Sequence, residues 1–208
     1  MCYQELTDRD DRSRPQFLSA PAQLLVLLHL QKEPIDNLSL AEPGRRLKYS
    51  RMTMSRVFSD LIGARLAEGI TVGSRKYIRF RETGKKLWKK VEPMLRSPVR
   101  SRSNARLPLD VYTVESGMTA LARLIPGQPS TPPEYAIDQR RYLALKKGGT
   151  LEEPLTDAED AVLESWAYDP ALVGKEGTVD VLSLYLSLKA AGEVGQEVLQ
   201  DLLEHVRW

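Results

Sequence analysis

Residues 45–69 read RRLKYSRMTMSRVFSDLIGARLAEG, and this stretch decides the fold that we predict for the first half of the chain. Apolar side chains recur there at the helical spacing i, i+3, i+4, i+7 and i+8, as Met54, Val57, Phe58, Leu61 and Ile62. Ser50 directly precedes this period and is a residue type that caps helix N-termini. The sequence therefore predicts an amphipathic helix over 51–62, with a polar and basic opposite face.

Two shorter helices are predicted before this stretch. The leucine-rich segment 24–30 predicts a buried helix that Ser19 caps and Glu33-Pro34 ends. Residues 38–42 predict a weaker helix, which Pro43-Gly44 should distort so that it restarts at Arg45.

A hairpin and a further helix are predicted after it. Residues 70–72 and 77–80 are strand-like, and Gly73-Ser74 between them has hairpin turn chemistry, with Arg75 and Lys76 at the tip. A helix then begins at about Gly84 and is stopped by Pro93 or by Ser97-Pro98.

This order of elements is that of a winged helix-turn-helix. The stretch 45–69 resembles the core of winged-helix regulators of the multiple-antibiotic-resistance (MarR) type, and Thr83-Gly84 resembles that family's T-x-x-G helix start in compressed form. The residues that carry the resemblance are Leu47, Ser50, Thr53, Met54, Arg56, Leu61 and Leu66. The likeness covers about residues 21–93, departs from the family at Pro43-Gly44 and in its short wing, and implies a DNA-binding transcriptional regulator.

The chemistry of the side chains fits double-stranded DNA, because Lys and Arg at phosphates supply most of the affinity and the major groove, about 12 Å wide, admits one helix. The predicted DNA-binding residues are Arg45, Arg46, Lys48, Ser50, Arg51, Met52, Thr53, Ser55, Arg56, Ser59, Arg75 and Lys76. Within this set, Arg51 and Arg56 are expected at guanine edges, and the hydroxyls at phosphates or bases. Arg75 and Lys76 would follow the minor groove or the backbone.

The charge of the chain divides between its halves. Residues 1–106 hold 22 Lys/Arg and 11 Asp/Glu, a balance of +11, whereas residues 107–208 hold 8 and 17, a balance of −9. Residues 37–106 alone reach +13. Such asymmetry indicates a nucleic-acid-binding part and a separate partner-facing part, although a polarised surface that serves only solubility is the alternative. We interpret Lys85, Lys86, Lys89 and Lys90 as a solvated helix face.

The acidic half predicts strands that alternate with helices, which favours a small α/β unit and, for the whole chain, a mixed α+β class. Strands are expected at 109–114, 135–137 and, with a helix as the alternative, 161–168; helices are expected at 115–124, 139–147 after Asp138, 181–189 after Asp180, and 193–206. The predicted organisation is a flexible arm at 1–18, a DNA-binding domain at 19–96, a linker at 97–108 and an acidic domain at 109–208.

No catalytic or cofactor motif accompanies these elements, so we expect no enzyme, no metal and no cofactor. His29 and His205 have no metal-ligand spacing, and Cys2 is a lone thiol, which favours a reducing cytoplasm. The acidic cluster Glu152, Glu153, Asp157, Glu159 and Asp160 lacks the spacing of a Ca²⁺ loop and is expected to be solvated; a Mg²⁺-dependent nuclease or transferase is the alternative. No apolar run could span a membrane, and no secretory signal peptide is expected in MCYQELTDRDDRSRP.

Residues 168–189 of the acidic half resemble the distal part of prokaryotic winged-helix regulators that are paired with a toxin gene. That resemblance implies a basic, toxin-like protein partner for residues 109–208, and dimerisation or effector sensing is the alternative. Trp166, Tyr168 and Tyr185 are expected in the core. A homodimer is expected only on general grounds, because helix-turn-helix proteins usually bind palindromic DNA sites as two-fold symmetric dimers. The sequence thus predicts an autoregulatory repressor, with an antitoxin-like protein-interaction adaptor as the second hypothesis.

Overall fold

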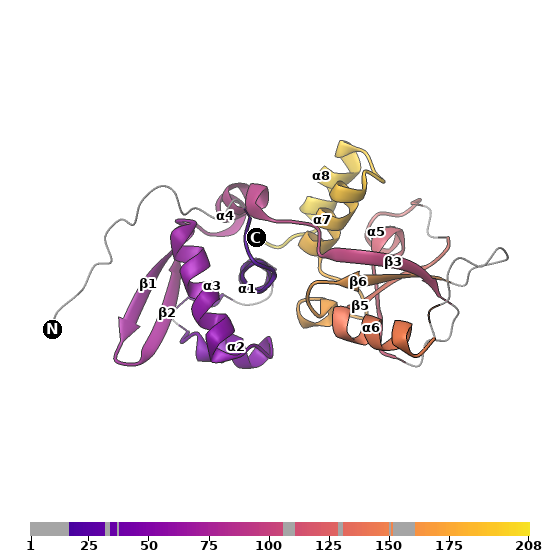
Figure 1. Ribbon diagram of the computed structural model, residues 1–208. Coiled ribbons are helices and arrows are strands. Elements are labelled where there is room, and N and C mark those ends of the chain that lie inside the picture. The colour runs from indigo at the N-terminus through magenta and orange to yellow at the C-terminus, as the bar shows by residue number, and fades with distance from the viewer. Residues whose placement is uncertain are drawn as a thin grey trace.

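The computed structural model describes residues 17–31, 34–36, 38–105, 111–128, 131–149, 151 and 161–208. These residues form a mixed α+β structure, as the sequence predicts, with one two-stranded and one four-stranded sheet. Figure 1 shows the two sheets at opposite ends of the molecule, with the first helix between them.

The first half carries the smaller sheet. Its elements are α1 (Ala20–Gln31), α2 (Ala41–Arg46), α3 (Arg51–Gly63), β1 (Ala67–Val72), β2 (Arg75–Phe80), α4 (Gly84–Val91) and the 3-10 turn η2 (Glu92–Met94). The predicted apolar face of α3 is confirmed, because Met54, Val57, Phe58 and Leu61 are buried. Ser50 caps α3 as predicted, and its Oγ accepts a hydrogen bond from the Thr53 N–H at 3.1 Å.

The second half carries the larger sheet. Its elements are β3 (Val99–Ala105), β4 (Val114–Glu115), α5 (Gly117–Leu124), β5 (Glu134–Asp138), α6 (Gln139–Lys147), β6 (Ala161–Trp166), the 3-10 turn η3 (Pro170–Leu172), α7 (Val181–Ala191) and α8 (Gln196–Glu204). The strand order is β3-β6-β5-β4, with β5 and β6 parallel and the other neighbours antiparallel. The predicted caps Asp138 and Asp180 both accept hydrogen bonds from the first turns of their helices.

A layer of helix covers each face of the larger sheet. Tyr142 of α6 packs with Ile137 and Leu163 on one face. On the other face Trp166 is fully buried and belongs to the main core together with α7 and α8. Tyr168 and Tyr185 are also buried there, so the expectation that all three aromatic residues lie in the core is confirmed.

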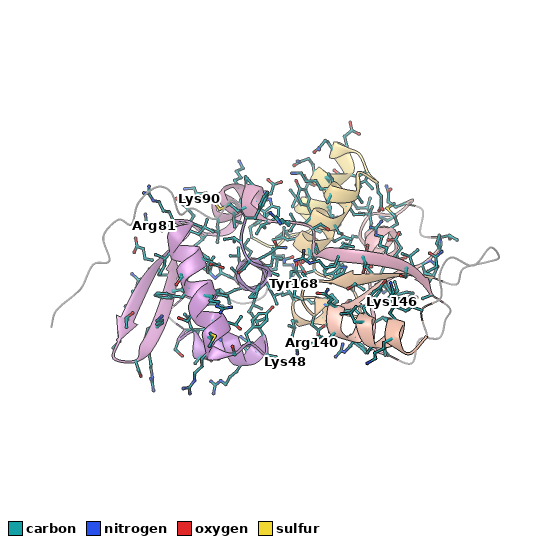
Figure 2. The ribbon with its side chains drawn as sticks, viewed as in Figure 1. Lys48, Arg81, Lys90, Arg140, Lys146 and Tyr168 are labelled. Atoms are coloured by element: carbon teal, nitrogen blue, oxygen red, sulfur yellow. The ribbon has the colours of Figure 1, made fainter. Side chains whose placement is uncertain are left out.

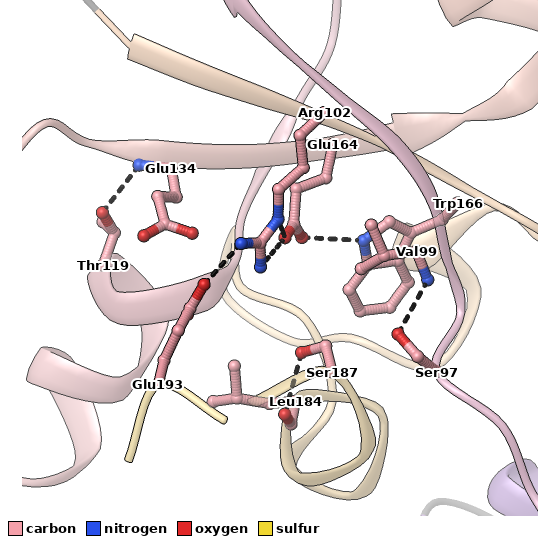
Figure 3. A network of polar contacts seen from close by, with 10 residues as sticks. All are labelled: Ser97, Val99, Arg102, Thr119, Glu134, Glu164, Trp166, Leu184, Ser187 and Glu193. Carbon is pink, nitrogen blue, oxygen red and sulfur yellow. Dashed lines mark hydrogen bonds and ion pairs between the residues drawn. The ribbon is translucent and has the colours of Figure 1, made fainter. Parts of the chain in front are cut away.

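A charged network ties this second face to the loop between α7 and α8 (Figure 3). The Glu164 side chain is fully buried, and its Oε1 lies 2.8 Å from Arg102 Nη2. Trp166 Nε1 donates to the other carboxylate oxygen at 2.9 Å, and Arg102 also pairs with Glu193. A buried carboxylate is tolerated in the fold only when such partners compensate its lost hydration.

The main apolar core is continuous across both halves and centres on α1. All residues from Ala22 to Leu30 are buried in this helix. Among them is His29, which is satisfied as expected: its Nδ1 accepts the Ile35 N–H at 3.1 Å, and its ring stacks on Phe80 at 4.2 Å. Burial lowers the pKa of His29, and nearby Asp36 offsets part of that effect.

Polar contacts close the junction between the halves. Gln31 Nε2 donates to Asp180 Oδ1 at 2.6 Å, and Gln23 Nε2 donates to the Tyr168 hydroxyl at 3.3 Å. Glu92 accepts hydrogen bonds from Tyr185 and Lys189 of α7. The two predicted domains therefore pack against each other through a shared core and direct hydrogen bonds.

Three sequence predictions are wrong in detail. The predicted linker 97–108 contains strand β3. This strand lies at the edge of the sheet with one side exposed, so its sequence is mostly polar and lacks the apolar pattern by which strands are predicted. Helix α2 runs unbroken through Pro43-Gly44, since a proline in the first turn of a helix sacrifices no internal hydrogen bond. The predicted arm 1–18 extends too far, because Leu18 is buried and donates its N–H to Met94 O at 2.8 Å; residues 1–16 of the arm lie outside the described part.

Smaller differences concern element ends. The last helix is Gln196–Glu204 and so is shorter than 193–206, and the strand expected at 109–114 is β4, with residues 109 and 110 outside the described part. Cys2 and the acidic cluster 152–160 also lie outside it. Within the described residues, the structure contains no helix with the length and apolar character that a membrane span needs.

Candidate nucleic-acid interface

The turn between α2 and α3 brings basic side chains to the N-terminal end of α3. Lys48 adopts the left-handed backbone conformation, with φ of 57°, and the Tyr49 N–H returns to Gly44 O at 2.8 Å. A Cβ on Gly44 would lie 2.8 Å from Met54 Cγ, so glycine allows α2 to approach α3 closely. Arg45, Arg46, Lys48 and Arg51 are all exposed around this turn.

The outward face of α3 is polar and basic except for one methionine. Arg51, Met52, Arg56 and Ser59 are exposed, and the Met52 side chain keeps 68% of its accessible area. Arg56 Nη2 lies 3.8 Å from Met52 Sδ, so these two side chains share one surface. Met52 is therefore an apolar side chain exposed beside Arg56 on this basic face.

The hairpin is tied to α3 by its own basic residue. Lys76 Nζ donates to Ser55 Oγ at 3.0 Å and lies 4.9 Å from the centre of the Phe58 ring. A Cβ on Gly69 would lie 2.4 Å from both Phe58 Cζ and Ile62 Cδ1, so β1 passes directly over α3. The hairpin and α3 therefore act as one block, which leaves Arg75 exposed at the turn.

The hydroxyl groups that were predicted to contact DNA form hydrogen bonds within the protein. Ser50 Oγ and Thr53 Oγ1 are 3.0 Å apart and satisfy each other, and Ser55 accepts from Lys76. Ser59 Oγ donates back to Ser55 O at 3.2 Å. These groups position the helix and the hairpin, so the cations and Met52 are the side chains that remain directed at solvent.

Most of the predicted cations have no neutralising partner among the described residues. In the part of the chain that the structure describes, no carboxylate lies within 4.0 Å of Arg45, Lys48, Arg51, Arg56 or Arg75. The N-terminus of α3 adds the partial positive charge of a helix end, and Ser50 already satisfies one of its N–H groups. The surface formed by Arg45, Lys48, Arg51, Met52, Arg56 and Arg75 is called the α3 surface below.

No known protein family, curated protein or solved structure matches the chain. The contacts of its own residues therefore carry the functional proposal.

The basic surface of α6 escaped the sequence analysis. Arg140, Arg141, Lys146 and Lys147 are exposed on this helix, although it belongs to the acidic half. The signal was present, because QRRYLALKK holds four of the eight basic residues in 107–208. The net charge of −9 over residues 107–208 does not indicate this local group of basic residues.

No alternative site for metal chemistry emerges from the described residues. They contain no group of three His, Cys, Asp or Glu side chains that could hold a metal ion. His205 is exposed, and its Nδ1 lies 3.0 Å from Asp201 O. The Mg²⁺ hypothesis rested on residues 152–160, which lie outside the described part.

Proposed function

We propose that this protein is a sequence-specific DNA-binding transcriptional regulator, which acts in a prokaryotic cytoplasm and represses its own operon. The observation that carries the proposal is the α3 surface, where five exposed cations have no carboxylate partner among the described residues and lie in the turn before α3, on α3 itself and at the hairpin turn. The order α1, α2, α3, β1, β2, α4 supports a winged helix-turn-helix, in which the third helix enters the major groove.

The roles of the individual residues follow from their positions. Arg51 and Arg56 lie on the exposed face of α3 and would reach guanine edges, with Met52 against an apolar base edge. Arg45 and Lys48 lie before the helix and would contact phosphates. Arg75 at the hairpin turn would contact the backbone or the minor groove beside the site, with the hairpin held by the bond between Lys76 and Ser55.

DNA binding is tested by titrating the full chain into fluorescent duplexes from its own upstream region and measuring anisotropy at several salt concentrations. Expected is a preference for one duplex over a shuffled duplex of equal composition, together with a linear fall of log K with log salt. Absence of both the preference and the salt slope would overturn the proposal.

A second candidate is an antitoxin-like adaptor that holds a basic protein partner through the second half. The observation that favours it is the exposed side of α8, where Glu197, Asp201 and Glu204 recur at helical spacing. Co-purification with the product of a neighbouring gene, lost after Glu197→Lys and Asp201→Lys, would support this role. If DNA binding fails while this complex forms, the adaptor replaces the regulator.

A further inference from the structure

Helix α6 concentrates the basic charge of the acidic half on one short surface. Arg140 and Arg141 lie in its first turn and Lys146 and Lys147 in its last, and all four are exposed. The two pairs are six residues apart, which is about 9 Å along a helix that rises 1.5 Å per residue. Around the helix axis, Arg140 and Lys147 lie on the same side, whereas Lys146 follows Tyr142 by about one turn. The opposite side of the helix is anchored, because Tyr142 is buried against the sheet and its hydroxyl lies 2.5 Å from Ser103 Oγ.

Three of these cations are not committed to partners within the described residues. No carboxylate there lies within 4.0 Å of Arg140, Lys146 or Lys147. Arg141 differs, since its Nε lies 3.2 Å from Asp138 Oδ2 and its Nη1 lies 3.9 Å from Asp169 Oδ2. Arg141 therefore fixes the start of α6, whereas the other three have no carboxylate partner among the residues that the structure describes.

The start of α6 is close to the turn that begins α3. Asp169 Oδ2 lies 3.9 Å from Arg141 Nη1, and the Asp169 charge also acts on Tyr49. Burial raises the pKa of the Tyr49 hydroxyl to about 12, and the neighbouring Asp169 adds to that rise. Tyr49 directly follows Lys48 and precedes the cap Ser50. In the view of Figure 2, Lys48 and Arg140 both point to the lower edge of the molecule.

This spacing is held by the core and not by a flexible tether. Tyr168, next to Asp169, is buried and bonds both to Gln23 of α1 and to Ser183 of α7. Helix α1 in turn belongs to the same core as α3. A ligand that spans the α3 surface and α6 would therefore not need to order the two halves first, which removes one cost of binding.

We propose that α6 is a second DNA-contacting element, which binds the sugar-phosphate backbone of the same duplex beside the segment that α3 reads. The proposal rests on the proposed DNA-binding function and extends it into the acidic half. Duplex DNA is the occupant favoured by charge and by continuity with the α3 surface. Successive phosphates of one strand advance about 3.4 Å along the axis, so cations about 9 Å apart can reach separate phosphates of one backbone.

The test compares two triple variants of the full chain that lose the same charge. The first is Arg140→Gln, Lys146→Gln and Lys147→Gln on α6. The control is Lys85→Gln, Lys86→Gln and Lys89→Gln on α4, which lies at the opposite, upper edge in Figure 1. Binding to the preferred upstream duplex is measured at several salt concentrations, and thermal unfolding of both variants verifies that these surface changes leave the fold intact.

The expected result is a salt slope about 2 to 3 units smaller for the α6 variant, because each lost phosphate contact removes about 0.9. The control variant should keep the wild-type slope. Preference for the specific duplex over the shuffled one should persist in both, since phosphate contacts carry no sequence information.

A second readout uses duplex length. Extending the duplex on one side of the α3-contacted segment should strengthen binding of wild type and of the control variant but not of the α6 variant. If wild type binds DNA specifically and the α6 variant keeps the wild-type salt slope and length dependence, the inference about α6 is wrong while the proposed function stands. An acidic protein would then be the candidate ligand of the α6 cations. If the salt slope falls equally in both variants, the loss of net charge explains the effect without a contact by α6, and the inference is also wrong. A wild-type chain that binds no DNA would overturn the proposed function as well.

Discussion

Lys76 on the hairpin and Ser55 on α3 are joined by a 3.0 Å hydrogen bond, so a residue that we expect to contact DNA also attaches the hairpin to α3. The same ammonium group lies over the Phe58 ring, which is buried beneath it. The Leu40 N–H donates to Lys76 O at 2.9 Å and adds a third attachment. Lys76 therefore attaches the hairpin to α3 through two contacts and to the segment before α2 through the third.

The first prediction concerns this bond. Ser55→Ala and Lys76→Met should each lower the free energy of unfolding by about 0.5–1 kcal/mol, the usual net value of one partly exposed hydrogen bond. The double variant should lose less than the sum, because either change alone already breaks the bond. Urea unfolding of the four proteins measures this, and strictly additive losses would show that the two side chains do not interact.

The second prediction concerns the crossing of β1 over α3. Gly69→Ala should destabilise the protein by about 1–3 kcal/mol, because the new methyl group would overlap Phe58 and Ile62. Gly63→Ala is the matched control, since nothing lies within 4 Å of a Cβ there, and it should stabilise by about 0.4–1 kcal/mol. Thermal unfolding gives both values, and equal effects from the two substitutions would contradict the close approach.

The third prediction concerns the buried Glu164. Arg102→Leu should cost about 3–5 kcal/mol, because it leaves a buried carboxylate without its cation. Combining it with Glu164→Gln should recover much of the loss, since an amide oxygen can still accept from Trp166 Nε1. Arg123→Leu, at an exposed pair with Glu115, should change stability little. Chemical unfolding checks the series, and a small effect of Arg102→Leu would disprove the role of the network.

The fourth prediction is a pH dependence at His29. Its folded pKa is lowered from 6.5, so the unfolded chain binds the proton more readily and acid favours unfolding. Protonation also removes the lone pair on Nδ1 that accepts the Ile35 N–H. The contribution of His29 should be constant above about pH 7 and should be lost progressively as the pH falls below 6.5.

The measurement for His29 is the unfolding free energy at about pH 7.5 and about pH 5.5 for wild type and His29→Phe. Wild type should lose more stability on acidification than the variant. The comparison cancels other groups, including Asp180, whose pKa burial raises and which acts in the opposite direction. An identical pH response in both proteins would rule out His29 as the titrating group.

The fifth prediction concerns base recognition by α3. Arg56→Ala should weaken binding to the preferred duplex by about 1–3 kcal/mol and relax specificity at one position, if the side chain contacts a base edge. Lys90→Ala, on the solvated face of α4, is the control and should leave binding unchanged. A loss of equal size on every duplex tested by anisotropy would assign Arg56 to a phosphate instead.

Much of the fold was predictable because its signals are local. The apolar period of α3, the caps Ser50, Asp138 and Asp180, and the Gly73-Ser74 turn each depend on residues within about one helical turn or one hairpin. Such patterns act before any tertiary contact forms. They also placed Arg51, Met52 and Arg56 on the outer face of α3 correctly.

The remaining features depend on partners that are distant in the chain. Strand β3 was predicted as a linker. Its hydrogen-bond partner is strand β6, and Arg102 of β3 lies opposite Glu164, which is 62 residues away in the sequence, so no local pattern indicates the pairing. The hydrogen bond that Ser55, a predicted DNA-binding residue, accepts from Lys76, 21 residues away, was likewise not predicted.

The sequence by itself determined which helix exposes the basic face and how that helix is capped, since both follow from spacing along the chain. Only the tertiary structure decided that Asp169, which pairs with Arg141 at the start of α6, lies near enough to raise the pKa of Tyr49 in the turn before α3. No periodicity encodes the proximity of Tyr49 and Asp169, which are 120 residues apart, because it arises only when a shared core brings their elements together.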